Sequence, residues 1–121
     1  ALLWLPRAAP TRALGALLLA SVALPRSPSL APGEFRVVQF DVGQGLAVLV
    51  QTAHHALLFD AGPRWWQGGD AGQHLVLPAL RALGVRRLDV LVVSHGDLDH
   101  AGGVASVVAG MPVGLLLASE A

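Results

Sequence analysis

The sequence predicts a layered α/β domain, and three observations indicate this class. Three short strand-like runs with tight connections occupy residues 35–60, as in an antiparallel meander. An amphipathic helical pattern follows over residues 73–83. Residues 88–93 (LDVLVV) are then almost continuously apolar, which is typical of a strand covered on both faces. This order describes the N-terminal half of a layered α/β domain, which we expect to span residues 33–121.

The residues before this domain include an apolar segment of membrane type. Residues 13–24 (ALGALLLASVAL) are uncharged and lie between Arg12 and Arg26. The run is shorter than the roughly 20 residues that span a bilayer, so a signal-peptide core or a buried helix is the alternative. Because another apolar stretch precedes the run and prolines follow it, we interpret residues 1–32 as the end of a transmembrane region and a Pro-rich linker.

Basic residues predict the orientation of this segment. Arg7 and Arg12 precede the apolar run, whereas Arg26 follows it. An excess of arginine on one side favours the cytoplasm for that side. We therefore expect the following domain on the outer face of the membrane.

Turn residues separate the strands of the predicted meander. We expect strands at residues 35–41 (FRVVQFD), 45–52 (GLAVLVQT) and 56–60 (ALLFD). A Gly-rich loop over residues 62–72 then leads to the helix, which Gly84 ends. The side chains expected on its buried face are Leu75, Val76, Ala79, Leu80 and Leu83. After the strand at 88–93 we expect a polar loop at 94–100, a short helix at 102–109 and a strand at 113–117.

The composition restricts the kinds of site that the chain can form. Eight arginines balance eight acidic residues, and the net charge is zero. A neutral chain lacks the basic character of a dedicated nucleic-acid-binding module. Cysteine is absent, which excludes disulfides and thiolate metal sites. Any metal ion must therefore be held by imidazole and carboxylate.

Residues 94–100 (SHGDLDH) combine two imidazoles and two carboxylates directly after the apolar strand. Ligands of α/β sheets bind at the carboxyl ends of strands. Imidazole nitrogen and carboxylate oxygen suit Zn²⁺, Mn²⁺ or iron. The spacing lets His95 and Asp97 reach one point while Asp99 and His100 reach a second, as in sites with two metal ions. The segment predicts a metal-binding loop.

Helix capping is the alternative explanation for the two carboxylates. Asp97 or Asp99 would cap a helix that begins near Ala101 without binding a metal ion. Capping accounts for one carboxylate and leaves the two flanking histidines unexplained. We therefore favour the metal site.

The segment His95-Gly96-Asp97-Leu98-Asp99-His100 resembles the HxHxDH metal motif of the metallo-β-lactamase superfamily, with Asp97 at the position of the second His. This variant resembles the hydrolase-like C-terminal domain of the ComEC competence proteins, which are inner-membrane DNA-uptake channels. Segments in the same order over residues 35–108 share this resemblance, notably residues 40–45 (FDVGQG), 57–63 (LLFDAGP) and 94–103 (SHGDLDHAGG).

The resemblance implies a metallo-β-lactamase-like αββα sandwich, of which this chain holds the N-terminal half. It implies two divalent metal ions, Zn²⁺ or Mn²⁺, with Asp99 as the residue that orients the attacking water. Asp60 corresponds to a residue that supports the metal loop, although a strand-end turn would also explain it. The later ligands of the family would follow Ala121, so we expect this chain alone to be inactive. Leu46 departs from the pattern, since many relatives have Asp there.

The resemblance also implies a function in DNA uptake at the inner membrane. We expect part of a multi-pass membrane protein that works with other competence components, with a nuclease domain acting on single-stranded DNA. One alternative is a catalytically weak structural or DNA-guiding domain of the channel. Another is a different hydrolase of this fold acting on a thioester or phosphate ester.

The remaining polar and aromatic residues have less specific patterns. We expect Asp41 and Gln44 to line the edge of the cleft, although the neighbouring glycines also fit a simple tight turn. Trp65 and Trp66 either stack on a nucleobase or pack their loop onto the domain, and we favour packing. Asp70 is expected to begin the helix as a cap or loop residue.

Overall fold

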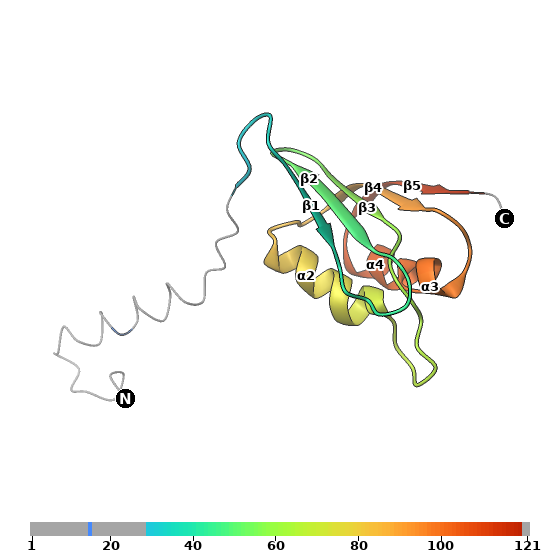
Figure 1. The fold of residues 1–121 in the computed structure, drawn as a ribbon. Helices are drawn as coiled ribbons and strands as arrows, with labels where there is room; N and C mark the ends of the chain where they lie inside the picture. Colours follow the sequence, from blue (N-terminus) through green and yellow to red (C-terminus); the bar gives the residue numbers. More distant parts are fainter. Residues whose placement is uncertain (1–14, 16–28, 120–121) are drawn as a thin grey trace.

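The computed structural model describes residue 15 and residues 29–119 of the chain (Figure 1). Almost all of the apolar run at residues 13–24 lies outside this part. Within the described residues, no helix has the length and hydropathy needed to cross a membrane. The elements are β1 (Phe35–Gln39), β2 (Val48–Thr52), β3 (Ala56–Phe59), η2 (Gly72–Val76), α2 (Leu77–Ala82), β4 (Leu88–Val93), α3 (Leu98–Ala101), α4 (Val104–Gly110) and β5 (Val113–Ala118).

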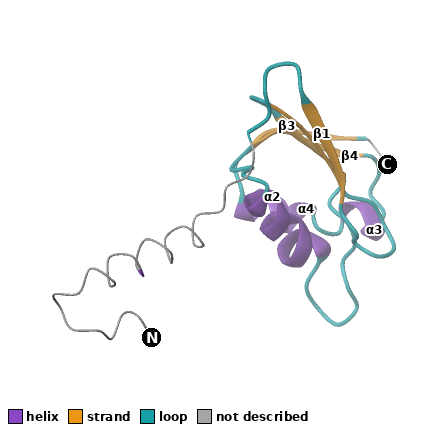
Figure 2. Ribbon diagram, turned by 60° about the vertical axis from the view of Figure 1, so that its left-hand side comes forward, coloured by secondary structure: helices purple, strands orange, loops and turns teal. Residues whose placement is uncertain are grey.

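One mixed sheet contains the five strands in sequence order. β1, β2 and β3 pair antiparallel, which confirms the predicted meander. β3 pairs with β4 and β4 with β5 in parallel, because helices connect these strands. The helices all lie on one face of the sheet (Figures 1 and 2). The predicted α/β class is therefore confirmed.

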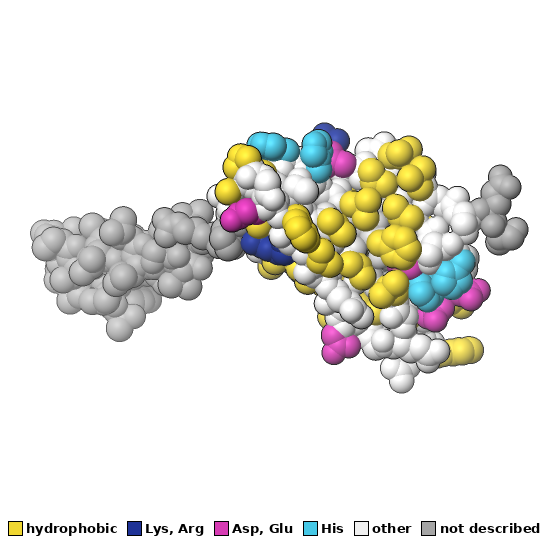
Figure 3. Space-filling view, turned by 45° about the horizontal axis from the view of Figure 1, so that its top comes forward, with side chains coloured by type: hydrophobic (Ala, Val, Ile, Leu, Met, Phe, Trp, Pro, Cys, Tyr) yellow, Lys and Arg dark blue, Asp and Glu magenta, His cyan; other side chains and the backbone are white. Residues whose placement is uncertain are grey.

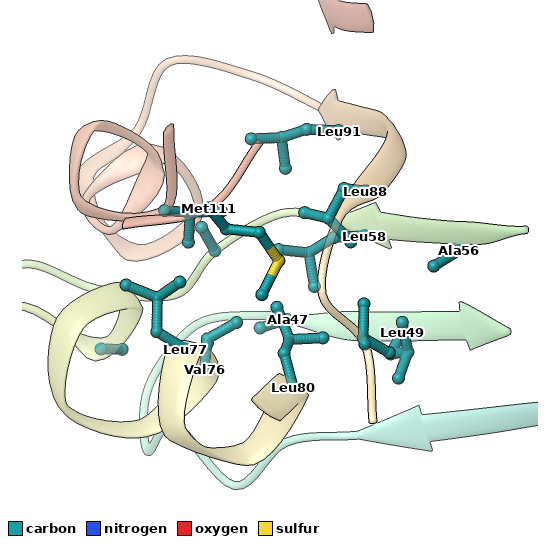
Figure 4. Packing of buried hydrophobic residues seen from close by; sticks show 14 of the residues in the cluster. Ala47, Leu49, Ala56, Leu58, Val76, Leu77, Leu80, Leu88, Leu91 and Met111 are labelled. Atoms are coloured by element: carbon teal, nitrogen blue, oxygen red, sulfur yellow. The ribbon is translucent and has the colours of Figure 1, made fainter. Parts of the chain in front are cut away.

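The hydrophobic core fills the space between the sheet and these helices (Figure 4). One row of side chains faces the helices across the central strands, and its members Leu49, Leu58 and Leu91 have no exposed surface. They pack against residues from η2, α2 and the end of α4, chiefly Val76, Leu77, Leu80 and Met111.

The opposite face of the sheet is apolar and open to solvent. Figure 3 shows hydrophobic side chains gathered on this face. A register row crosses all five strands there, and none of its members is fully buried: Val37, Val50, Leu57, Val90 and Leu115. The strongest exposure lies on the two edge strands, with Val37 at 56% and Leu115 at 51%. We call this surface the open face.

The predicted helix at 73–83 is present, but its first part is not a regular α-helix. Residues 72–76 form a wide π-helical turn, and the α-helix begins at Leu77. Pro78 has no N–H to continue a regular ladder into the preceding turn, which favours this interruption. The π-helical turn changes which side chains face the core. Leu77 is buried, whereas Leu75, which was expected on the buried face, is 39% exposed.

Candidate metal centre

The metal-type motif begins where β4 ends and continues into a short helix. The sequence predicted a polar loop through residue 100, but Leu98–Ala101 form α3, and Asp99 and His100 lie on it. Asp97 is at the N-cap position with an extended backbone, and its side chain makes no capping hydrogen bond. The backbone carbonyl of Asp97 accepts the bonds from His100 and Ala101 instead. Helix capping therefore does not explain the presence of the Asp97 and Asp99 carboxylates.

Three side chains of the motif converge at this point. One ligand-capable atom each from His95, Asp99 and His100 lies within 4.8 Å of the others. The two imidazole rings are neighbours, with centroids 4.1 Å apart. Asp97 is outside this group of three and is 77% exposed, but its Oδ2 lies 3.4 Å from His95 Nε2. The group can hold a metal ion by its donor atoms.

Asp60 lies beneath the cluster and has no exposed surface. Its backbone adopts a left-handed conformation with φ 58°, which is uncommon outside glycine. The carboxylate accepts hydrogen bonds from Ser94 N–H (2.8 Å), Ser94 Oγ (2.7 Å) and His100 Nδ1 (2.8 Å). Burial alone would raise the pKa of Asp60, but these hydrogen bonds outweigh it and lower the pKa below its ordinary value. Asp60 is therefore an ionised acceptor.

An ionised Asp60 fixes the tautomers of both neutral imidazoles. It can only accept, so His100 donates from Nδ1. The Ser94 hydroxyl donates its single proton to Asp60, so the 2.8 Å contact between Ser94 Oγ and His95 Nδ1 has the imidazole as donor. Both rings then carry their proton on Nδ1. The Nε2 lone pairs of His95 and His100 remain available for a ligand.

These Nε2 atoms each face a carboxylate oxygen. The distances are 3.4 Å from His95 Nε2 to Asp97 Oδ2 and 3.7 Å from His100 Nε2 to Asp99 Oδ2. Neither pair contains a donor when the rings are neutral, so a metal cation between the two members would bind both of them. Two ligand atoms of a tetrahedral zinc ion are separated by about 3.4 Å, from bond lengths of about 2.0–2.1 Å. The donor chemistry and the spacing of both pairs therefore fit divalent metal ions.

Close backbone contacts fix the position of α3 against the rest of the domain. A Cβ on Gly45 would collide with the carbonyl oxygen of Asp99, and Leu46 N–H donates to that same oxygen at 3.3 Å. Just after α3 in the chain, a Cβ on Gly103 would meet the backbone of Ala61 and Gly72. The glycines of the FDVGQG and HAGG segments therefore permit a tight fit around the cluster.

A cleft of about 780 Å³ opens beside Asp99. Gln44 lines it, as expected, whereas Asp41 is exposed, does not line it, and accepts a 3.4 Å hydrogen bond from Gly43 N–H. Ser94 and Arg64 were not predicted as site residues. Ser94 connects Asp60 to His95, and Arg64 lines the cleft. Ser94 begins the SHGDLDH segment, but the contacts of both residues depend on the fold.

The residues around the Gly-rich loop have distinct roles. Trp65 packs against the core and stacks on His74, with ring centroids 5.7 Å apart, so the expected packing is confirmed for this residue. Trp66 is fully exposed, contrary to that expectation. Asp70 accepts from Gln73 N–H at 2.8 Å and from Ser106 Oγ at 2.6 Å. It thereby acts as a cap for η2 and connects η2 to α4.

A mixed sheet covered by helices on one face, with a His/Asp cluster at the carboxyl end of β4, defines an α/β domain with a candidate metal site. The family model of the metallo-beta-lactamase superfamily matches residues 40–118. The chain belongs to this superfamily, as its motif predicted.

Similarity to a competence protein and to a recombination protein confirms the predicted resemblance. The chain is 46% identical over 106 residues to Competence protein ComA of Neisseria gonorrhoeae, covering 88% of this chain and 15% of the relative. It is 37% identical over 83 residues to Recombination protein 2 of Haemophilus influenzae, covering 69% and 10%. It is 39% identical over 77 residues to the uncharacterized protein YcaI of Escherichia coli K12, covering 64% and 10%. The chain thus spans 10–15% of the length of these curated relatives.

Proposed function

We propose that this chain contributes a metal-dependent phosphodiesterase domain that acts on DNA during DNA uptake. The observation that carries this proposal is the pair of imidazole–carboxylate contacts at the end of β4, each of which presents one nitrogen and one oxygen ligand to a divalent cation. Membership of the metallo-beta-lactamase superfamily supports hydrolysis as the reaction class. The names of the competence and recombination relatives support DNA as the substrate.

His95 and Asp97 hold one divalent ion in this proposal, and Asp99 and His100 hold a second. Zn²⁺ and Mn²⁺ suit this set of nitrogen and oxygen ligands. When bound, such ions polarise a phosphoryl oxygen and make water nucleophilic near neutral pH. Asp60 keeps His100 oriented, and Ser94 transmits the same constraint to His95.

Asp99 is the proposed catalytic residue. Its carboxylate belongs to the ligand cluster and also lines the cleft, so it borders both the metal position and the space for substrate. One of its oxygens can bind an ion while the other accepts a hydrogen bond from the attacking water. The side chain is 37% exposed, which leaves it accessible from the cleft.

We also propose a membrane setting for the domain. In this account residues 1–32 are the end of a transmembrane region with its linker, and residues 33–121 begin the hydrolase domain. The whole protein is a multi-pass inner-membrane protein with this domain on the outer face. The competence relatives and the arginines around residues 13–24 support this arrangement.

The test is cleavage of a single-stranded oligonucleotide by the intact protein loaded with Zn²⁺ or Mn²⁺. We expect cleavage that His95→Ala and Asp99→Ala abolish. His54→Ala is the matched control, because His54 is an exposed histidine in the β2–β3 turn. Equal losses in His54→Ala and His95→Ala would contradict the site. Metal binding without cleavage would instead favour a DNA-guiding domain.

A further inference from the structure

A hairpin over residues 63–71, the 63–71 arm, projects from the domain between β3 and η2 (Figure 1). Arg64 and Asp70 form an antiparallel bridge at its base. Trp65 N–H donates to Gly69 carbonyl at 3.1 Å, and Gly68 N–H donates to Trp65 carbonyl at 3.2 Å. Arg64 N–H also bonds to the carbonyl of Leu98 on α3. The arm is therefore an ordered hairpin attached to the helix of the candidate metal centre.

The two tryptophans of the arm have opposite environments. Trp65 anchors the arm by packing against the core and stacking on His74. Trp66 is completely exposed, with a relative exposure of 105%. A fully solvated indole contributes nothing to the packing of the arm, and its faces remain open to a planar ligand.

The cleft joins Trp66 to the candidate metal centre. Trp66 and Arg64 of the arm line it, and so does Asp99 of α3. Among the described residues, no ion pair engages the Arg64 guanidinium, whereas Arg87 pairs with Asp89 at 3.3 Å. Gln44 and Gln67 add amide groups to the same lining. The cleft thus offers an aromatic face, a free cation and hydrogen-bonding amides beside a ligand cluster.

We propose that the 63–71 arm binds single-stranded nucleic acid, with an unpaired base stacked on Trp66 and a phosphate bound by Arg64. The inference rests on the proposed function, since it supplies the substrate of that site. Stacking on an aromatic side chain requires a base whose face is free, as in a single strand. Paired bases inside a duplex present only their edges in the grooves. The arm therefore selects single strands over duplex.

Membrane contact is the competing use of an exposed tryptophan. Leu98, which is 66% exposed, lies in the same cleft and would add apolar surface to such a contact. The polar residues of the lining argue against it, because a guanidinium, two amides and the Asp99 carboxylate would all be desolvated. Their chemistry matches phosphate, base edges and a metal-assisted reaction instead.

The test is the affinity of the intact protein for a labelled thymidine 12-mer, measured by fluorescence anisotropy. Trp66→Ala should weaken binding about 5- to 150-fold, the range expected for loss of one stacked base. Trp66→Phe should retain most of the affinity, whereas Trp66→Leu, apolar but not aromatic, should not. Arg64→Ala should weaken binding and reduce the slope of log affinity against log salt by about 0.7. Val108→Ala, an exposed apolar change on α4 outside the cleft, is the control and should change nothing.

Duplex of matching sequence should bind more weakly than the single strand and be insensitive to Trp66→Ala. Unchanged single-strand affinity in Trp66→Ala would overturn the proposal. Equal affinity of Trp66→Leu and Trp66→Phe would also overturn it, because apolar contact would then suffice. Quenching by brominated lipid that disappears in Trp66→Ala, with oligonucleotide binding unaffected, would assign the residue to membrane contact.

Binding and cleavage distinguish this inference from the proposed function. Trp66-dependent binding without cleavage would leave the inference standing and remove the phosphodiesterase. Cleavage by a protein whose binding does not depend on Trp66 would instead overturn the inference and leave the proposed phosphodiesterase standing.

Discussion

Asp60 determines, at the scale of single residues, which nitrogen atoms the two histidines present. Its carboxylate accepts directly from His100 and, through the Ser94 hydroxyl, controls His95. An amide at position 60 would have one acceptor oxygen and a donor NH₂ in place of two acceptor oxygens. The pattern of protons across both imidazoles would then change.

Asp60→Asn should therefore weaken metal binding by about 10- to 100-fold, as for other partners of metal-binding histidines. Competition titration of the intact protein with a zinc chelator measures this. Asp41→Asn is the control, because Asp41 is exposed, does not line the cleft, and accepts a hydrogen bond from Gly43 N–H at 3.4 Å. Unchanged zinc affinity in Asp60→Asn would show that the tautomer constraint has no influence on the site.

The residues of the site were predictable to different degrees. The spacing of His95, Asp99 and His100 identified the cluster, because all three side chains belong to one short segment. The left-handed backbone of Asp60 and its contact with Ser94, 34 residues away, were not predictable from local pattern. Trp65 and Trp66 are adjacent and chemically identical, yet one anchors the arm and the other is solvated. Only the hairpin geometry decides between them.

At the scale of secondary-structure elements, the main feature is the close packing of η2 against the start of α4. A Cβ on Gly103 would meet the backbone of Gly72 and Ala61, which cannot yield as a flexible side chain would. Gly103→Ala should therefore destabilise the protein by about 1–3 kcal/mol, the usual cost of overpacking. Gly96→Ala is the matched control, because a Cβ there meets nothing within 4 Å. Equal unfolding midpoints in urea for both variants would contradict this packing.

Asp89 joins β4 to the beginning of β3. Ala56 N–H donates to its carboxylate at 2.9 Å, and this bond lowers the pKa of Asp89 against an opposing effect of burial. The charges of Arg87 and His55 lower it further. A depressed folded pKa means that the carboxylate stabilises the fold above its unfolded pKa of about 3.9. This contribution is lost as the pH falls through the lowered value.

Asp89→Asn should consequently lower the melting temperature at pH 7 and have a diminishing effect as the pH falls below about 4. Thermal unfolding of parent and variant across this pH range measures the difference. A difference that stays constant, or that grows in acid, would contradict the assigned hydrogen bond.

The strands were easier to predict from the sequence than the helices. Alternation and turn glycines identified the meander, although β1 and β2 are shorter than expected because residues 40–47 form the loop that contacts α3. The wide turn of η2 and the separate helix α3 depend on Pro78 and on tertiary contacts of the metal-type loop. A periodicity argument that assumes one regular helix cannot detect either feature.

At the scale of the whole molecule, the main feature is the apolar surface that the open face of the sheet exposes to solvent. Apolar residues cross all five strands there, and both edge strands expose large side chains, including Phe35 at 70%. The αββα sandwich of the superfamily would cover such a face with a second sheet. An uncovered apolar surface with exposed edges favours self-association.

We therefore expect the 121-residue chain, expressed alone, to associate and to bind metal below stoichiometry. Its cluster offers about two protein ligands for each ion, fewer than the three of a typical hydrolytic zinc site. Sedimentation velocity with and without Zn²⁺ checks the first expectation. A soluble monomer at high concentration would show that exposure of the open face does not cause self-association.

Metal content of the intact protein tests the central claim most directly. After growth with Zn²⁺ and Mn²⁺, elemental analysis should find about two divalent ions per chain, as expected for a two-metal site. His95→Ala and Asp99→Ala should each reduce this number, and His54→Ala should leave it unchanged. The absence of bound metal in the parent, or equal content in parent and His95→Ala, would contradict the account.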